Sequence, residues 1–204
     1  MAQPERGYVS PEAYLQMERD AENKNEYFNG EIFAMTGASF NHNLIAVNIT
    51  SSLHGALRDS PCYVLSSDMK IQVDKARHYV YPDVSIVCDR VEFSGERENI
   101  VVNPIVLFEI LSVATRDYDR GSKFMAYRNV ISLKDYILVD QYSLHVEHFQ
   151  KNDKDQWVLD EYKSQSDAFI IKSIGVEGVE LSLQNIYDRV KIEDHERRGM
   201  DKTN

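Results

Sequence analysis

The chain has 204 residues, of which 43% are hydrophobic and 27% are charged, as in an ordinary globular protein. With 33 acidic and 23 basic residues its net charge is −10, which opposes non-specific nucleic-acid binding because such binding depends on lysine and arginine. The N-terminus lacks an apolar signal segment, and the longest apolar stretch, residues 104–111, is too short to span a bilayer. We therefore expect a soluble, cytoplasmic protein with no membrane partner.

The length favours one domain, which we expect to span residues 1–192, followed by a polar and disordered tail at 193–204. No internal repeat or Gly/Ser linker divides this range. Cys62 and Cys88 have neither metal-ligand spacing nor a disulfide-rich context, so we expect two reduced thiols.

The N-terminal third predicts a helix and a hairpin. Ser10 and Pro11 open a helix that runs to about residue 23, because serine caps helices and proline suits their first position. This helix is expected to bury Tyr14, Leu15 and Met17. Residues 26–33 read as a β-hairpin, since an Asn-Gly pair at its centre favours a type I′ turn.

The middle of the chain predicts the order helix, three strands, helix, strand. Apolar residues recur at helical spacing from His42 to Arg58, namely at Ile45, Ile49, Leu53 and Ala56. We then expect a half-exposed strand at 64–73, strands covered on both faces at 79–88 and 105–111, a helix at 120–128 capped by Asp119, and a buried strand at 136–140. Short strands at 144–149, 157–161 and 168–171 and a helix at 184–190 complete the expected elements.

Two carboxylates interrupt this apolar pattern. Asp83 lies within residues 79–88, and Glu109 stands in the middle of residues 105–111. An unpaired ionised carboxylate is so costly in a protein interior that it must be paired, protonated or bound to a metal. A salt bridge or a cap would satisfy one acid, whereas two acids on neighbouring strands favour a functional site. Pro82 indicates an irregular strand beside Asp83, because proline cannot donate to the ladder.

Lys123 is the candidate cation for these acids. It lies near the start of the expected helix at 120–128, on one face with Asp119 and Tyr127. It either belongs to the site or forms an exposed i,i+4 pair with Asp119, and the pattern leaves both interpretations open.

Three further polar residues could also belong to the site. His42 shares a helical face with Ile45 and Ile49, so it points toward the sheet as a core histidine or as a ligand. Glu26 and Glu31 flank the hairpin turn and fit either the site or a solvated strand. The sequence contains no Gly-rich phosphate loop, nucleophile elbow or zinc-ligand spacing.

These motifs, in this order, resemble the PD-(D/E)XK nuclease superfamily and, more closely, the Uma family of "putative restriction endonucleases". The similarity extends from Ser10 to about Val190, and its most specific segments are residues 27–32, 81–84, 108–112, 118–124 and 136–140. The superfamily pattern has a lysine two residues after the second acid, where this chain has Leu111. The resemblance implies that Lys123, on the following helix, replaces it.

The resemblance implies an α/β fold of the α+β mixed-sheet type, with a restriction-endonuclease-like core, an N-terminal helix and hairpin, and extra C-terminal strands. It also implies an endonuclease that hydrolyses DNA with Mg²⁺ or Mn²⁺. Asp83 and Glu109 would hold the metal, and Lys123 would orient a water and offset charge on the phosphate. Residues that would contact these three and support them are Glu31, His42, Asp119 and Tyr127. We further expect a homodimer, which would double the contacts with a duplex.

Two other functions remain open at this stage. The net charge and the displaced lysine also suit a protein that keeps the nuclease fold for binding or regulation without catalysis. A metal-dependent phosphohydrolase of small molecules would tolerate the acidic surface best, since it needs no DNA groove.

Overall fold

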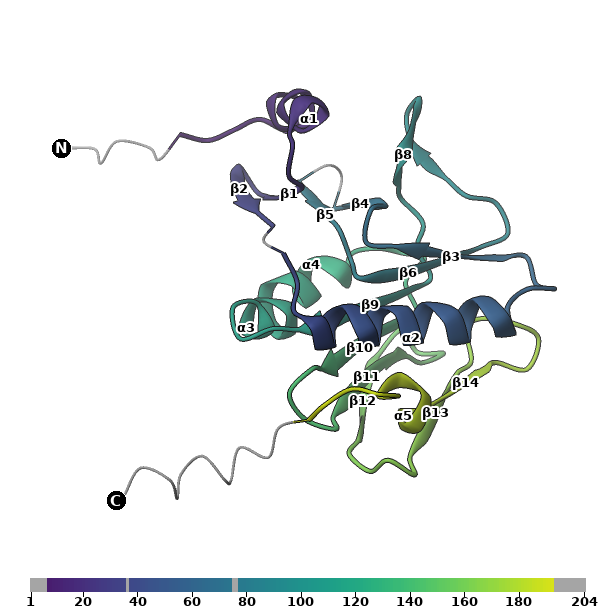
Figure 1. The fold of residues 1–204 in the computed structure, drawn as a ribbon. Coiled ribbons are helices and arrows are strands. Elements are labelled where there is room, and N and C mark those ends of the chain that lie inside the picture. The colour runs from purple at the N-terminus through teal and green to yellow at the C-terminus, as the bar shows by residue number, and fades with distance from the viewer. Residues whose placement is uncertain (1–6, 36, 75–76, 193–204) are drawn as a thin grey trace, which may run out of the picture.

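The computed structural model describes residues 7–35, 37–74 and 77–192, which form two six-stranded sheets, a two-stranded sheet and several helices (Figure 1). The first sheet has the order β2-β1-β5-β4-β8-β7 and consists of β1 (Asn25–Phe28), β2 (Glu31–Ala34), β4 (Lys70–Val73), β5 (His78–Val80), β7 (Phe93–Ser94) and β8 (Arg97–Val101). Its β4–β8 pair is parallel and its other pairs are antiparallel.

The second sheet carries the main core. Its order is β12-β11-β10-β9-β6-β3, formed by β3 (Cys62–Ser66), β6 (Val84–Cys88), β9 (Val106–Leu111), β10 (Asp135–Asp140), β11 (Val146–Lys151) and β12 (Trp157–Tyr162). The central β9–β10 pair is parallel. Every residue of β9 is buried, as expected for a strand covered on both faces.

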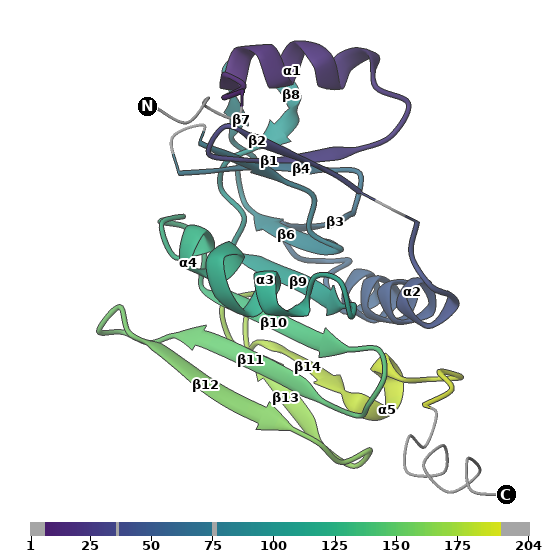
Figure 2. The same cartoon turned by 90° about the vertical axis from the view of Figure 1, so that its left-hand side faces the viewer.

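Helices cover both sheets (Figure 2). They are α1 (Pro11–Asp20), α2 (Phe40–Ala56), α3 (Arg116–Tyr118), the π-helical turn η1 (Asp119–Lys123), α4 (Phe124–Tyr127) and α5 (Leu183–Ile186). One face of the second sheet packs on α2, α5 and the small sheet of β13 (Ala168–Ile171) and β14 (Val179–Ser182). Its other face packs on α4 and on apolar residues of the first sheet, while α1 covers the far side of the first sheet. None of the described helices is both long and apolar enough to cross a membrane.

The N-terminal predictions are largely confirmed. The Ser10 hydroxyl accepts a hydrogen bond from the Ala13 amide at 3.2 Å and so caps α1, whose Tyr14 and Leu15 are buried. Met17 is 41% exposed, so its predicted burial is wrong. Asn29 and Gly30 have φ values of 47° and 98°, and two positive φ angles are what a type I′ turn requires.

The predicted core order is also confirmed, with α2, the strands β3, β6 and β9, a helical segment and then β10. Ile45, Ile49 and Leu53 form the buried stripe of α2, which continues at Leu57 and not at the exposed Ala56. The elements after β10 agree with the prediction to within a few residues, except that β14 was not expected; β7 and β8, which precede β9, were not expected either. The predicted tail at 193–204 lies outside the described residues.

Two predicted strands are each divided between the two sheets. Residues 64–73 form β3 in the second sheet and β4 in the first, and residues 79–88 form β5 in the first sheet and β6 in the second. The second crossing occurs at Tyr81–Asp83, where Pro82 cannot donate a ladder hydrogen bond. Asp83 therefore stands at the junction of the two sheets.

The helical segment after β9 begins earlier than predicted. It starts at Arg116, and Asp119 is a buried residue inside it and not its cap. The segment bends at Gly121, whose φ of −102° and ψ of −105° are not helical. The segment is therefore two short helical turns joined by a kink.

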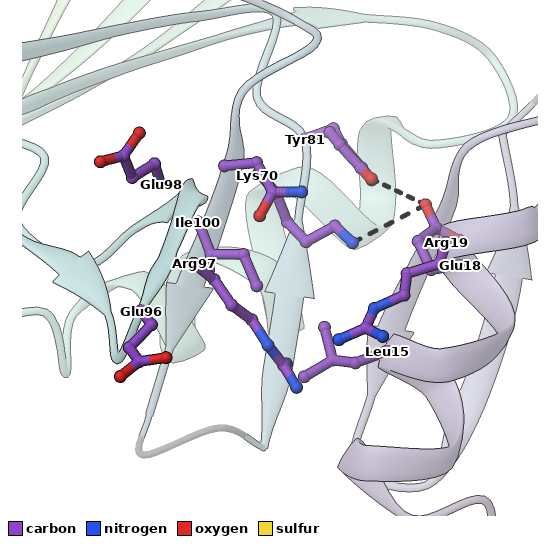
Figure 3. A pocket seen from close by; sticks show the side chains of 10 residues that line it. Leu15, Glu18, Arg19, Lys70, Tyr81, Glu96, Arg97, Glu98 and Ile100 are labelled. Atoms are coloured by element: carbon purple, nitrogen blue, oxygen red, sulfur yellow. Dashed lines mark hydrogen bonds and ion pairs between the residues drawn. The ribbon is translucent and has the colours of Figure 1, made fainter.

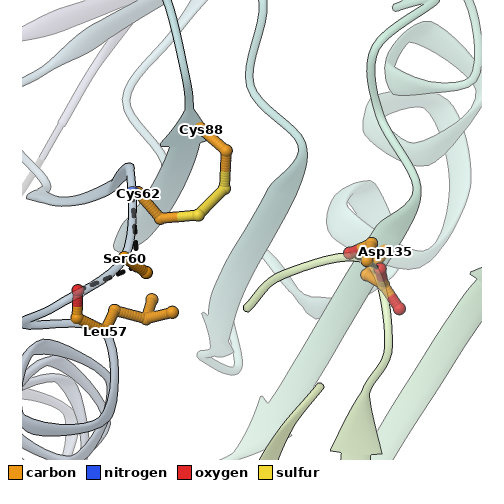
Figure 4. The surroundings of a disulfide bond; sticks show 6 residues. Leu57, Ser60, Cys62, Cys88 and Asp135 are labelled. Carbon is orange, nitrogen blue, oxygen red and sulfur yellow. Dashed lines mark hydrogen bonds between the residues drawn. A yellow bond between two sulfur atoms is a disulfide. The ribbon is translucent and has the colours of Figure 1, made fainter. Parts of the chain in front are cut away.

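The prediction of two reduced thiols is wrong, because Cys62 and Cys88 form a disulfide (Figure 4). The two residues face each other in the antiparallel pair β3–β6, with Cα atoms 3.9 Å apart. Their spacing in the sequence gave no sign of this, since only the register of the two strands brings them together. Ser60 supports the turn before β3 by donating from its hydroxyl to the Leu57 carbonyl at 2.8 Å.

Candidate active site

The centre of the site is a buried ion pair between β9 and η1. The Lys123 ammonium lies 2.9 Å from Glu109 Oε1, and the Tyr127 hydroxyl donates to the same oxygen at 2.8 Å. Side-chain exposure is 6% for both Lys123 and Glu109. The helical spacing that placed Lys123 and Tyr127 on one face therefore brings both to the predicted acid.

Two further carboxylates lie beside the same ammonium. Lys123 Nζ is 3.0 Å from Glu26 Oε1 and 3.6 Å from Asp119 Oδ1. Glu26 comes from β1, and the Tyr81 amide donates to its Oε1 at 3.0 Å. Asp119 is buried with 4% side-chain exposure, so the interpretation of Asp119 and Lys123 as an exposed surface pair is wrong.

Asp83 lies one position beyond the antiparallel pair Val84–Phe108, and so beside Glu109. Its Oδ2 accepts a hydrogen bond of 2.7 Å from the Ile110 amide, and its Oδ1 is 3.2 Å from His42 Nε2. Asp83 and His42 keep side-chain exposures of 13% and 16%. This side of the site is therefore the one that a ligand from solvent can reach.

The start of α2, which carries His42, is fixed to the carboxyl end of β9. The Ser39 hydroxyl donates to Gln141 Oε1, and Gln141 Nε2 donates to the Leu111 carbonyl at 2.8 Å. Ser39 also caps α2 by accepting from the His42 amide. Gln141 is buried, and its role had no signal in the sequence because it depends on a contact between distant segments.

The site holds more negative charge than its one buried ammonium can offset. Burial raises the pKa of Glu109 well above its usual value, and the charges of Asp119, Asp83 and Glu26 raise it further against the opposing effect of Lys123. Burial likewise raises the pKa of Asp119. Burial alone would lower the pKa of Lys123, but Glu109, Glu26 and the other anionic neighbours hold it well above its usual value. Lys123 therefore stays charged, and its single positive charge is shared among three neighbouring carboxylates.

The partly exposed Asp83 and the buried Glu109 beside it suit a hard divalent cation. Both contacts of Glu109 use Oε1, which leaves Oε2 without a hydrogen bond to the described residues. Mg²⁺ prefers oxygen ligands and often binds through one or two carboxylates, with waters and substrate phosphate completing its shell. Within residues 7–35, 37–74 and 77–192, no three His, Cys, Asp or Glu side chains form a ready ligand set. Asp83 and Glu109 thus fit a metal that shares its coordination with water and substrate.

The structure does not bring all the candidates together. Glu31 is exposed on β2, and no hydrogen bond or ion pair joins it to the described residues of the site. The other hairpin acid, Glu26, takes its place. Strand alternation does not distinguish them, because Glu31 pairs with Phe28, two residues after Glu26, and so shares its face; Glu31 instead lies on the edge strand β2, whereas Glu26 lies on β1 between β2 and β5.

The mixed sheets, with α2 on one face of the second sheet, are consistent with the restriction-endonuclease-like fold. The chain belongs to the Uma2 family, described as "Putative restriction endonuclease", whose model matches residues 11–184.

Relatives and a solved structure agree with this membership. The uncharacterised proteins slr1290 and sll1609 of Synechocystis sp. are 38% and 35% identical to the chain, and the matches cover 82% and 75% of it. They cover 87% and 86% of the two relatives. The crystal structure of a "putative nuclease belonging to DUF820" from Anabaena variabilis superposes with a TM-score of 0.74 over 90% of this chain and 99% of that one. Its sequence identity of 16% makes this a likeness of fold.

Proposed function

We propose that this protein is a divalent-metal-dependent endonuclease that hydrolyses phosphodiester bonds of DNA. The observation that carries the proposal is the excess of carboxylates around Lys123 at the sheet junction, with Asp83 at its solvent side. Membership of the Uma2 family supports the same class of activity.

In the proposed site Asp83 and Glu109 would hold Mg²⁺ or Mn²⁺. The bound ion would polarise the scissile phosphate and lower the pKa of a water. The Ile110 amide and His42 orient Asp83, while Tyr127 and Lys123 hold Glu109 through Oε1. Lys123 also adds a fixed positive charge near the phosphate, where negative charge grows in the transition state.

The test of activity is cleavage of plasmid and single-stranded DNA with Mg²⁺, with Mn²⁺ and with EDTA. We expect cleavage only with a metal, and its loss in Asp83→Asn, which removes one charge at nearly constant shape. The matched control is Asp117→Asn, since Asp117 has 98% side-chain exposure on the neighbouring α3. Cleavage that persists in EDTA or in Asp83→Asn would overturn the proposal.

Metal binding is tested separately by calorimetry. Asp83→Ala and Glu109→Ala should each bind Mg²⁺ more weakly than the wild type, because each removes a direct ligand. Unchanged affinity in both variants would remove these residues as the metal site.

A second candidate is a metal-dependent phosphohydrolase of small molecules, which the net charge of −10 favours. This second function would be supported if wild type hydrolyses bis(p-nitrophenyl) phosphate, Asp83→Asn does not, and DNA is left uncleaved by both. If neither substrate is cleaved but DNA is bound equally by wild type and Asp83→Asn, the chain uses its nuclease fold for binding alone.

A further inference from the structure

A separate cavity of about 450 Å³ lies on the α1 side of the first sheet, and Lys123 is not among the residues that line it (Figure 3). Residues of α1, β4, β8 and the Tyr81 crossing line it, and those that carry the argument are Leu15, Glu18, Arg19, Lys70, Tyr81 and Arg97. Its volume falls within the range of small-molecule sites.

Lys70 is a buried cation whose donors are not used. Its residue exposure is 5%, and its nearest carboxylate oxygen, Glu18 Oε1, is 4.0 Å away, which is too far for a hydrogen bond. The ammonium has three N–H donors, and none is hydrogen-bonded to the described residues. The rings of Tyr14 and Tyr81 flank it at 5.1 and 5.3 Å. Burial lowers the pKa of Lys70, as expected for a charge that lacks full compensation.

Glu18 is already engaged by other donors. Its Oε1 accepts hydrogen bonds from the Asn25 amide at 3.1 Å and from the Tyr81 hydroxyl at 2.7 Å. Its Oε2 accepts from Asn25 Nδ2 at 3.0 Å. The carboxylate therefore serves to join α1 to β1 and to the Tyr81 crossing, and it only partly offsets Lys70.

Two guanidinium groups converge on the same cavity. Figure 3 shows the side chains of Arg19 and Arg97 directed toward each other, on the side to which Lys70 extends. Neither arginine forms an ion pair with the described residues, and the charge of Arg97 acts against that of Lys70. Glu96 and Glu98 also line the cavity, but both are exposed, and Figure 3 shows their carboxylates apart from the Arg97 guanidinium. Lys70, Arg97 and Arg19 thus form a cationic part of a lining that also holds Glu18, Glu96 and Glu98.

We propose that this cavity binds a phosphate group through Lys70, Arg97 and Arg19. Guanidinium groups pair with phosphate oxygens through parallel N–H donors, and a compact ammonium supplies a point charge at the buried end. The apolar side of the cavity, formed by Leu15 and the Tyr81 ring, leaves room for a small organic group attached to the phosphate. The ligand is therefore free phosphate or a small phosphate monoester, and the site does not depend on nuclease activity.

The test is calorimetry on the full chain with two probes, inorganic phosphate and a deoxynucleoside 5′-monophosphate, in a metal-free buffer without competing oxyanions. Lys70→Gln and Arg97→Gln should each weaken binding about tenfold or more, because each removes a charged hydrogen-bond donor. The control is Lys172→Gln, which removes the same charge from an exposed residue of the loop after β13. The control should bind like the wild type.

The two probes distinguish the sources of the phosphate. Tighter binding of the nucleotide supports a monoester, and equal binding supports free phosphate. If Lys70→Gln fails to fold by circular dichroism, Arg97→Gln still decides, because Arg97 is only half-buried. The proposal is overturned if the wild type binds neither probe, or if Arg97→Gln binds both as the wild type does.

Discussion

Lys123 is the residue whose surroundings differ most between the two interpretations of the sequence. An exposed pair with Asp119 would contribute less than about 1 kcal/mol. The structure instead buries Lys123 among Glu109, Glu26 and Asp119. Removal of one member of a buried ion pair costs about 3–5 kcal/mol, because the charges left behind are uncompensated. Lys123 thus contributes to stability as well as to the proposed chemistry.

Substitution of Lys123 can separate these two contributions. We expect Lys123→Ala to lose about 3–5 kcal/mol in urea unfolding. Lys123→Arg keeps the charge, but its planar fork cannot occupy the place of a compact ammonium, so kcat/KM for DNA cleavage should fall by about 10²–10³-fold. Lys172→Arg is the matched control and should cleave normally. Wild-type cleavage by Lys123→Arg would exclude a specific role of the ammonium.

Glu109 gives the site a characteristic dependence of stability on pH. Burial and the neighbouring acids raise the pKa of its folded form above the usual value of 4.5. Between that value and the raised pKa, the folded chain binds more protons than the unfolded chain, so Glu109 makes the metal-free protein less stable as pH rises.

Glu109→Gln removes this dependence. In EDTA, the free energy of unfolding of Glu109→Gln should increase relative to that of wild type as pH is raised from about 5 to about 8, across the range above the usual glutamate pKa, because only wild type loses stability there. The control, Glu180→Gln, changes an exposed acid on β14 and should give a constant difference. A relative stability of Glu109→Gln that falls with rising pH would contradict the raised pKa.

At the scale of elements, the two crossings between sheets determine where the site forms. The chain leaves the second sheet after β3, builds β4 and β5 in the first sheet, and returns at Pro82 to begin β6. Glu26 on β1 and Asp83 at the return point are thereby brought to the same junction. The segment α3–η1–α4 then supplies Lys123, with the bend at Gly121 inside it.

The disulfide between β3 and β6 should stabilise this arrangement. Cys62 and Cys88 are 26 residues apart, and closing a loop of that size in the unfolded chain is worth about 3.5 kcal/mol. The double variant Cys62→Ser/Cys88→Ser should lose about that amount in urea unfolding. Wild type with a reductant should behave like the variant, and the variant itself should not respond to the reductant. Labelling of both cysteines in unreduced, denatured protein would contradict the disulfide.

At the scale of the whole molecule, the net charge of −10 must be reconciled with the proposed DNA substrate. A bound divalent cation offsets acids only locally, so a duplex needs further contacts. We propose that a two-fold dimer supplies them. The strand β12 lies at an edge of the second sheet, and Val158 and Leu159 on it are each 46% exposed. An exposed edge strand of this kind is a ready surface for pairing.

Sedimentation at micromolar concentration tests the dimer. We expect wild type to sediment as a dimer and Leu159→Lys to sediment as a monomer, because a charge on the edge strand opposes pairing. Val176→Lys, at a fully exposed position elsewhere, is the control and should remain dimeric. A monomeric wild type would remove the proposal.

The sequence by itself determined the elements of the core and the main candidates of the site. Periodicity located α2 through Ile45, Ile49 and Leu53, and continuous apolar runs located β9 and β10. Asp83 and Glu109 were found because an acid within such a run conflicts with burial. These signals are local, and a local pattern reports that a residue is buried without reporting what buries it.

Only the tertiary structure decided which distant residues meet. It places Glu26 beside Lys123 and leaves Glu31 exposed, although both flank one turn. It also divides two predicted strands between sheets and joins Cys62 to Cys88. Each of these outcomes depends on the register and crossing of strands that lie far apart in the chain. Their energies come from contacts between segments, so the pattern within any one segment could not reveal them.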